Sequence, residues 1–205
     1  ADEFTSWVRG VLEIGLMDPK VRLENRMKIL GFFRAQLDDR KANPRDDDLI
    51  TDLLNTRVDG ELVSEDYVMG VCNLMLVAGI DTTWSAIGSS LWHLARHPEH
   101  RRQLREQPEI WPMAIEELLR AYSPVTMARI VDRDTEFQGC PMHAGDRVLM
   151  SFPAANRDPR QFDNPDDVIL DREHNRHVAF GAGIHRCAGS NLARLELRVA
   201  LQTWM

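Results

Sequence analysis

The chain has few cysteines and no excess of basic side chains. Its 205 residues include three cysteines, Cys72, Cys140 and Cys187, which lie far apart and form no CxxC pair. This count excludes a disulfide scaffold and favours a reducing compartment. Lysine and arginine number 25 against 32 acidic residues, for a formal net charge of −7, and no basic tract stands out. Nucleic acid is therefore not an expected partner.

Long apolar runs are also scarce. The longest, Leu74 to Ile80, stops at Asp81 and is well short of the roughly 20 residues that cross a bilayer. No signal peptide opens the chain, so we expect a soluble, cytoplasmic protein. Both termini fall inside helical patterns, which predicts that the sequence is a fragment of a longer one.

Hydrophobic periodicity predicts a mainly α fold with a small antiparallel β part. Helical spacing covers residues 4–40 with a break at Asp18-Pro19, and a short helix ends near Leu54. The longest helix is expected from Ser64, as its cap, to His97-Pro98. Further helices are predicted at 98–106 and 108–122, short strands at 125–153, an irregular meander at 156–177 and a final helix that starts near Cys187.

Cys187 lies in a loop whose composition suits a metal–thiolate centre. The segment Phe180-Gly181-Ala182-Gly183-Ile184-His185-Arg186-Cys187-Ala188-Gly189 places it after two glycines and at the expected start of a helix. A thiolate at a helix N-terminus is stabilised by the helix dipole, and glycines allow the backbone to approach a flat cofactor. Taken alone, a single cysteine before a helix is more often a buried structural thiol.

This segment resembles the signature of the cytochrome P-450 superfamily, Phe-Gly-x-Gly-x-His/Arg-x-Cys-x-Gly, at every fixed position. The resemblance implies haem b with Cys187 as the axial thiolate ligand of the iron. It also implies that His185 and Arg129 bind the haem propionates and that Phe180 lies against the proximal ligand.

A second segment, Ala78-Gly79-Ile80-Asp81-Thr82-Thr83, lies midway along the longest predicted helix. Glycine and two β-branched residues are locally unfavourable there, which suggests a function. Ala78, Gly79 and Thr82 share one face with Met75 and Ala86, and this face forms a small-residue groove. The segment resembles the family's Ala/Gly-Gly-x-Asp/Glu-Thr-Thr motif, which implies that Asp81 and Thr82 relay protons to dioxygen. The ordinary alternative is a back-bonded threonine beside an exposed aspartate.

Glu117 and Arg120 stand three residues apart and so share a helix face. In isolation such a pair is usually a solvated surface ion pair. The pair resembles the family's Glu-x-x-Arg motif, and Arg172 of the meander resembles its third partner. The resemblance implies a structural clamp made of Glu117, Arg120 and Arg172.

The resemblance covers nearly the whole chain and identifies residues 1–205 as the C-terminal part of a single haem-binding catalytic domain of the soluble bacterial type, without its N-terminal half and extreme C-terminus. Segments 84–92 and 175–177 are similar to those of the self-sufficient, reductase-fused subgroup. Val125, Thr126 and Met127 are expected to line a substrate pocket. Arg186, Arg194 and Arg198 form a candidate docking surface for a ferredoxin- or flavodoxin-type partner, with a solvated helix face as the alternative.

The implied function is a monooxygenase that inserts one atom of dioxygen into a small apolar substrate. Three alternatives stay open: a peroxide-driven peroxygenase, which would not need Asp81 and Thr82, a haem-thiolate sensor, and an inactive fragment. The substrate itself depends on a few apolar side chains and is not specified by the sequence.

Overall fold

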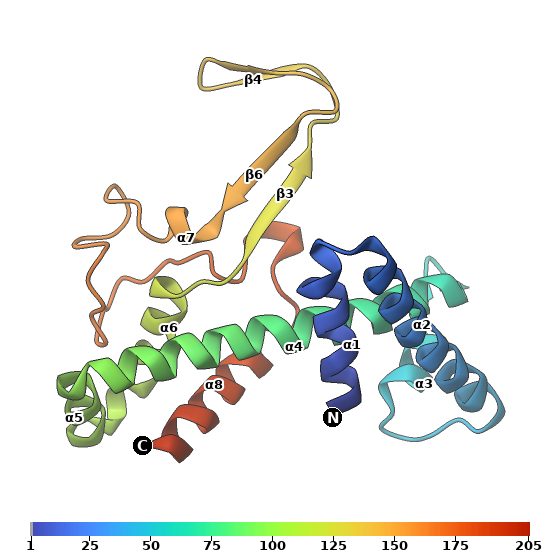
Figure 1. Cartoon of the computed structure of the whole chain (residues 1–205), viewed down its shortest axis with the longest axis horizontal. Helices are drawn as coiled ribbons and strands as arrows, with labels where there is room; N and C mark the ends of the chain where they lie inside the picture. The colour runs from blue at the N-terminus through green and yellow to red at the C-terminus, as the bar shows by residue number, and fades with distance from the viewer. Residues whose placement is uncertain (1) are drawn as a thin grey trace. The chain divides into compact units, whose positions relative to one another are not determined.

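The computed structural model describes residues 2–205, whose contacts separate into two compact units, one ending at Asp81 and the other comprising Thr82–Met205 (Figure 1). The unit that ends at Asp81 contains α1 (Asp2–Leu12), η1 (Ile14–Leu16), α2 (Pro19–Ala42), α3 (Leu49–Leu54), β1 (Arg57–Val58), β2 (Glu61–Leu62) and the first half of α4 (Glu65–Arg96). The mainly α fold with a small antiparallel part is confirmed.

The break between α1 and α2 falls where the sequence predicts it. Asp18 caps α2, because its side chain accepts hydrogen bonds from the backbone N–H groups of Lys20 and Val21, and Pro19 occupies the first helical position. The buried core of this unit joins α2 to α4 through residues that include Leu37, Val68, Met69 and Cys72.

The helix α4 begins at Glu65, and the Ser64 hydroxyl accepts a hydrogen bond from the Tyr67 backbone N–H at 3.2 Å, as its predicted capping role requires. Its 32 residues end at Arg96, immediately before His97-Pro98. The β1–β2 hairpin just before it was expected only as a turn at Val58-Asp59-Gly60. Two-residue strands are too short to show alternation, which explains the difference.

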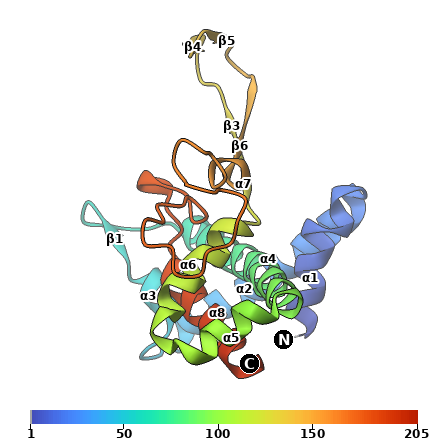
Figure 2. The same ribbon diagram turned by 90° about the vertical axis from the view of Figure 1, so that its left-hand side faces the viewer.

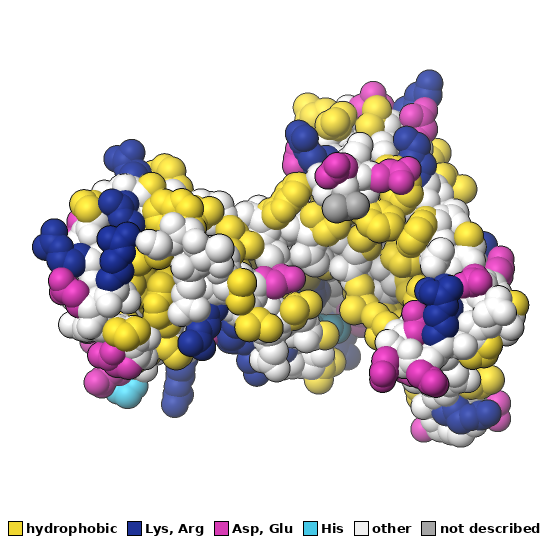
Figure 3. All heavy atoms as spheres, turned by 90° about the horizontal axis from the view of Figure 1, so that it is seen from below, with side chains coloured by type: hydrophobic (Ala, Val, Ile, Leu, Met, Phe, Trp, Pro, Cys, Tyr) yellow, Lys and Arg dark blue, Asp and Glu magenta, His cyan; other side chains and the backbone are white. Residues whose placement is uncertain are grey.

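Much of the apolar surface of α4 is exposed. Among residues 2–205, α4 is the one helix long and apolar enough to cross a membrane by length and composition, and 11% of its most apolar stretch is buried. A single helix of this kind is weak evidence, since core helices of soluble proteins have the same composition. Figure 3 shows hydrophobic side chains open on one face of the molecule.

The unit Thr82–Met205 is built on the second half of α4. It adds α5 (Pro98–Glu106), η2 (Pro108–Ile110), α6 (Trp111–Ala121), β3 (Thr126–Ile130), β4 (Thr135–Phe137), β5 (Cys140–Met142), β6 (Arg147–Ser151), α7 (Phe152–Ala155), η3 (Gly183–His185) and α8 (Ser190–Trp204). In Figures 1 and 2, α5, α6 and α8 gather around this half of α4. Their shared core includes Leu94, Leu104, Leu118, Leu197 and Leu201, each at most 1% exposed.

The predicted strands form two antiparallel ribbons. β3 pairs with β6, with Thr126 opposite Ser151 and Ile130 opposite Arg147, and β4 pairs with β5. The turn at Gln138-Gly139 has positive φ at both residues, which suits the tight connection between β4 and β5. Figure 2 shows these ribbons projecting away from the helices of this unit.

The segment 156–177 forms neither helix nor strand, as the sequence predicts for the meander. The last helix differs from the prediction in its start. α8 begins at Ser190, three residues after Cys187, so the cysteine lies in the loop before the helix and not in its first turn.

Candidate functional site

The Cys187 loop is closed by backbone hydrogen bonds. The Cys187 N–H donates to the Phe180 carbonyl at 2.9 Å, the Arg186 N–H donates to Gly183, and the Gly181 N–H donates to Val178. These bonds hold Cys187 beside the start of α8. Its thiol is free and exposed.

Two glycines make this loop possible. Gly181 has φ +71° and Gly183 has φ +67°, in the left-handed region that is costly for residues with a Cβ. Gly189 lies beside the sulfur, because a Cβ placed on this glycine would be 3.9 Å from the Cys187 Sγ. Ile184 is 96% exposed in the same loop. An accessible soft sulfur with an exposed apolar side chain beside it fits the thiolate ligation and flat shape of haem.

The other two cysteines are poorer candidates for a metal ligand. Cys72 is buried in the core of the first unit, and burial raises the pKa of its thiol, which keeps the sulfur protonated. Cys140 is exposed at the start of β5, where no glycine-rich loop surrounds it. Only Cys187 combines access with a constrained loop among the three.

The residues implied in haem binding are separated along the chain. His185 lies in η3 and is exposed, while Arg129 is exposed on β3 and donates to the carbonyl of its neighbour Ala128 at 2.9 Å. Within residues 2–205 no hydrogen bond or ion pair joins His185 to Arg129. Phe180 is half-buried and packs against the core of the second unit.

The acid–alcohol segment lies within α4, without a break in the helix. Ala78 and Gly79 are exposed, and a Cβ placed at Gly79 would meet nothing within 4 Å. Asp81 and Thr82 are half-buried and lie at the boundary between the two units. Among the described residues, the helix face at Gly79 is thus open.

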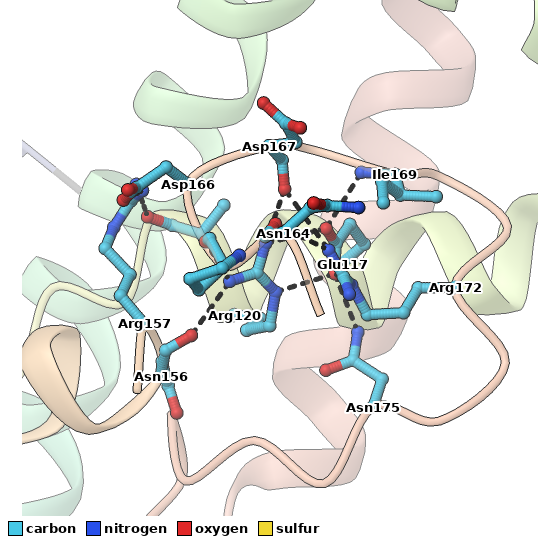
Figure 4. Close-up of polar contacts among 12 residues, drawn as sticks. Glu117, Arg120, Asn156, Arg157, Asn164, Asp166, Asp167, Ile169, Arg172 and Asn175 are labelled. Carbon is cyan, nitrogen blue, oxygen red and sulfur yellow. Dashed lines mark hydrogen bonds and ion pairs between the residues drawn. The ribbon is translucent and has the colours of Figure 1, made fainter. Parts of the chain in front are cut away.

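The structure brings Glu117, Arg120 and Arg172 together in one buried network (Figure 4). Glu117 and Arg120 are both 0% exposed. The Glu117 Oε1 accepts hydrogen bonds from Arg120 Nη2 at 2.8 Å and from the Ile169 N–H at 2.9 Å. Its Oε2 accepts from Arg120 Nε, Arg172 Nε and Asn175 Nδ2 at 2.8, 2.9 and 3.0 Å. Burial alone would raise the pKa of Glu117, but these hydrogen bonds outweigh it and lower the pKa.

Both arginines also hold the backbone of the meander. Arg120 uses its remaining N–H groups on the carbonyls of Asn156, Pro165 and Asp167, at 2.7–2.8 Å. All five of its donors are then satisfied. Arg172 donates to the carbonyls of Asp163, Asn164 and Asp167. A segment without regular secondary structure gains hydrogen-bond partners for its backbone in this way.

The neighbouring Glu116 forms a second, partly buried connection that the sequence analysis missed. Its carboxylate accepts hydrogen bonds from both Arg194 Nε (2.5 Å) and Arg194 Nη2 (2.9 Å) of α8, and it contacts His177 Nε2 at 2.9 Å. The Arg194 guanidinium lies 4.6 Å from the Phe180 ring centroid. Glu116 therefore supports the Cys187 loop from α6, while Glu117 faces the meander. Two adjacent acids in a helix that is apolar apart from Arg120 were the available signal.

Arg194 is consequently not a free docking charge. Arg194 was predicted to belong to a docking surface with Arg186 and Arg198. Its guanidinium instead forms an ion pair with Glu116, and its side chain is 27% exposed. Of the residues expected to line a pocket, Val125 is half-buried, whereas Thr126 and Met127 are exposed at the start of β3.

The Glu116 pair predicts a loss of stability in acid. Burial alone would raise the pKa of Glu116, but hydrogen bonds from His177 and Arg194 lower it to about 2 from an ordinary value of 4.5. Because the pKa of Glu116 is lower in the folded protein, the ion pair makes its full contribution to the free energy of unfolding above pH 4.5. This contribution is lost as pH falls toward 2.

In urea unfolding of the full-length protein, Glu116→Gln should therefore lower the free energy of unfolding by about 2 kcal/mol at pH 6, and by progressively less at pH 4 and pH 3. The exposed Glu109→Gln provides the control and should cost little at any of these pH values. A Glu116→Gln cost that is the same at pH 6 and pH 3 would contradict the assignment.

The chain matches the cytochrome P450 family over residues 20–205. It is 42% identical over 158 residues to a probable cytochrome P450 127A1 of Sinorhizobium fredii, covering 77% of this chain and 38% of that protein. The solved structure of the bacillaene polyketide synthase cytochrome P450 PksS of Bacillus subtilis superposes with a TM-score of 0.91 at 33% identity, covering 98% of this chain and 52% of that one.

A third match is P450BioI, solved in complex with an acyl carrier protein ligated to hexadec-9Z-enoic acid. Its TM-score is 0.88 at 33% identity, and the match covers 98% of this chain and 53% of that one. The chain thus belongs to the cytochrome P450 family. It spans about half the length of the relatives that it matches.

Proposed function

We propose that the protein containing this chain is a haem-thiolate monooxygenase that inserts one atom of dioxygen into a small apolar organic substrate, with electrons from a redox partner. The observation that supports this most directly is the accessible Cys187 thiol in a loop shaped by Gly181 and Gly183, within the region that matches the family. Haem b, when bound, supplies the iron at which dioxygen is reduced and activated.

Each of the chain's own site residues would have a separate role. Cys187 would ligate the iron as a thiolate, with Phe180 beside it, and His185 and Arg129 would pair with the propionates. Ala78 and Gly79 would leave room for the ring and the gas on the open face of α4. The Thr82 hydroxyl would hold and pass a proton that Asp81 resupplies.

Substrate and partner are proposed only by class. A small apolar molecule fits the residues expected near the pocket, Val125, Thr126 and Met127. The electron donor would be a ferredoxin- or flavodoxin-type protein or a fused reductase domain. The complex of P450BioI with an acyl carrier protein also makes a carrier-bound substrate worth including in substrate screens.

Substitution of Thr82 tests the proton relay. In a full-length, haem-loaded protein supplied with a surrogate ferredoxin, its reductase and NADH, Thr82→Ala should lower product per NADH by at least about tenfold. Water can replace part of the hydroxyl's role, so the loss should be smaller than the ~100-fold or more of a full proton-transfer effect.

The adjacent Thr83→Ala is the matched control, because it makes the same change on another face of α4. Unchanged product yield in Thr82→Ala, with haem intact, would exclude the relay. Product that forms from hydrogen peroxide without NADH, and equally well in Thr82→Ala, would favour the peroxygenase. Haem binding without turnover by either route would favour a sensor or an inactive protein.

A further inference from the structure

Three histidines converge where α4 ends and α5 begins. His93 is in the last turn of α4, His97 lies between the two helices, and His100 is in α5. One nitrogen from each ring lies within 4.8 Å of the other two. The ring centroids are 4.2 Å apart for His93 and His97, 5.0 Å for His93 and His100, and 5.3 Å for His97 and His100. All three belong to the unit Thr82–Met205, and none takes part in the site described above.

Hydrogen bonds fix which nitrogens are available. The Nδ1 of His93 lies 2.8 Å from the Tyr122 hydroxyl, and the Nδ1 of His97 lies 2.8 Å from the Glu99 Oε1. The His97 ring therefore has its Nε2 left for another partner. The Nε2 of His93 already lies 2.8 Å from the Nδ1 of His100. A carboxylate on the second ring nitrogen, as Glu99 is for His97, is a usual support for a histidine that binds a metal.

The surroundings favour neutral imidazoles. His93 is 2% exposed, and burial, reinforced by the facing His97 and His100, lowers its pKa to about 4. Burial is also the main cause that lowers the pKa of His100. Neutral imidazole is the form that carries a lone pair for a cation.

We propose that His93, His97 and His100 bind a divalent transition-metal ion of the zinc class, through His93 Nε2, His97 Nε2 and His100 Nδ1. Imidazole nitrogens suit zinc, copper(II) and nickel(II), whereas magnesium and calcium prefer oxygen. A fourth, solvent-open position remains, because the His97 side chain is 41% exposed. The bound ion would fasten the end of α4 to α5.

Binding requires a small rearrangement. Zn–N bonds of about 2.0–2.1 Å place tetrahedral ligand nitrogens about 3.3 Å apart. The His97 nitrogen must therefore move closer to the other two, whereas His93 Nε2 and His100 Nδ1, which lie 2.8 Å apart, must separate slightly. His97, whose side chain is 41% exposed, can supply most of this movement by side-chain rotation. The hydrogen shared by His93 Nε2 and His100 Nδ1 moves to the other nitrogen of its own ring, so the tautomer changes without net proton release.

The alternative is a purely structural hydrogen-bond network around Tyr122. That network accounts for His93 and for its contact with His100, but it gives no role to the convergence of His97 and its Glu99 support. A metal accounts for all five side chains, which are the three histidines, Tyr122 and Glu99. The two interpretations differ in whether zinc binds at all.

Calorimetric titration of zinc chloride into the full-length, haem-loaded protein, produced without a polyhistidine tag, tests the proposal. We expect one zinc ion per chain at this site, a higher melting temperature with zinc, and no heat with magnesium. His97→Gln and His100→Gln should each weaken zinc binding at least about 100-fold. Glu99→Gln, which keeps all three rings, should weaken it about tenfold or more.

A matched histidine and a matched thiol serve as controls. His143 is exposed after β5 and Cys140 is exposed within it, so His143→Gln and Cys140→Ser should leave zinc binding unchanged. The proposal is overturned if zinc does not bind, if His97→Gln binds it as tightly as the parent protein, or if Cys140→Ser abolishes binding. Because the readout is zinc affinity, the result is independent of monooxygenase activity.

Discussion

Glu117→Gln is expected to yield a protein that accumulates little haem. The substitution leaves one acceptor oxygen where two now receive five hydrogen bonds, and it places an amide N–H₂ against the N–H groups of Arg120 and Arg172. It also leaves two guanidinium charges together in a buried site. Breaking a buried ion pair in this way costs about 3–5 kcal/mol, a large part of the stability of a typical domain.

The ratio of haem to protein after purification of the full-length variant, with its melting temperature, measures this effect. Glu116→Gln is the matched control because it makes the same change one residue earlier in α6, at a carboxylate that is 29% exposed. We expect Glu116→Gln to retain haem with a smaller loss of stability. Normal haem occupancy and an unshifted melting temperature in Glu117→Gln would show that the clamp does not support the haem site.

Cys187→Ser is expected to abolish the absorption spectrum of a thiolate-ligated haem. A serine hydroxyl has the size of the thiol but gives up its proton far less readily, so it does not replace a soft anionic ligand. The reduced, carbon monoxide-bound spectrum measures this directly, because its Soret band reports thiolate ligation.

The two other cysteines provide matched controls for that spectrum. Cys140→Ser changes an exposed thiol and Cys72→Ser changes a buried one, and both should keep the thiolate band. If the band survived in Cys187→Ser, the axial ligand would have to be another residue. If Cys140→Ser removed it, the assignment to the Cys187 loop would be wrong.

Local signals in the sequence predicted most of the helices. The break at Asp18-Pro19, the Ser64 cap and the end of α4 before His97-Pro98 each depend on residues within one or two turns of the helix end. The β1–β2 hairpin was missed because two-residue strands carry no period, and α8 begins later than Cys187 because Gly189 and not the cysteine is its N-cap.

The site was predictable to the extent that its motifs are contiguous. The Cys187 loop and the segment from Ala78 to Thr82 could be proposed as site residues from order and spacing alone, and they remain predictions. The pairing of Glu116 could not be predicted, because its partner Arg194 is 78 residues away and nothing local links them. The histidine cluster was missed for a different reason. Its three members stand at i, i+4 and i+7, a spacing that would share one face of a continuous helix, but the helix was expected to end at His97-Pro98, which separates them in the sequence pattern.

The clamp constrains the length of the meander more than its composition. Arg120 and Arg172 bind backbone carbonyls at Asn156, Asp163, Asn164, Pro165 and Asp167, and every residue type carries a carbonyl. Side chains at most of these positions can therefore drift over evolutionary time while the acceptors stay in place. Inserting or deleting one residue would instead shift every acceptor downstream of it. The segment should vary in sequence among relatives while its number of residues is kept.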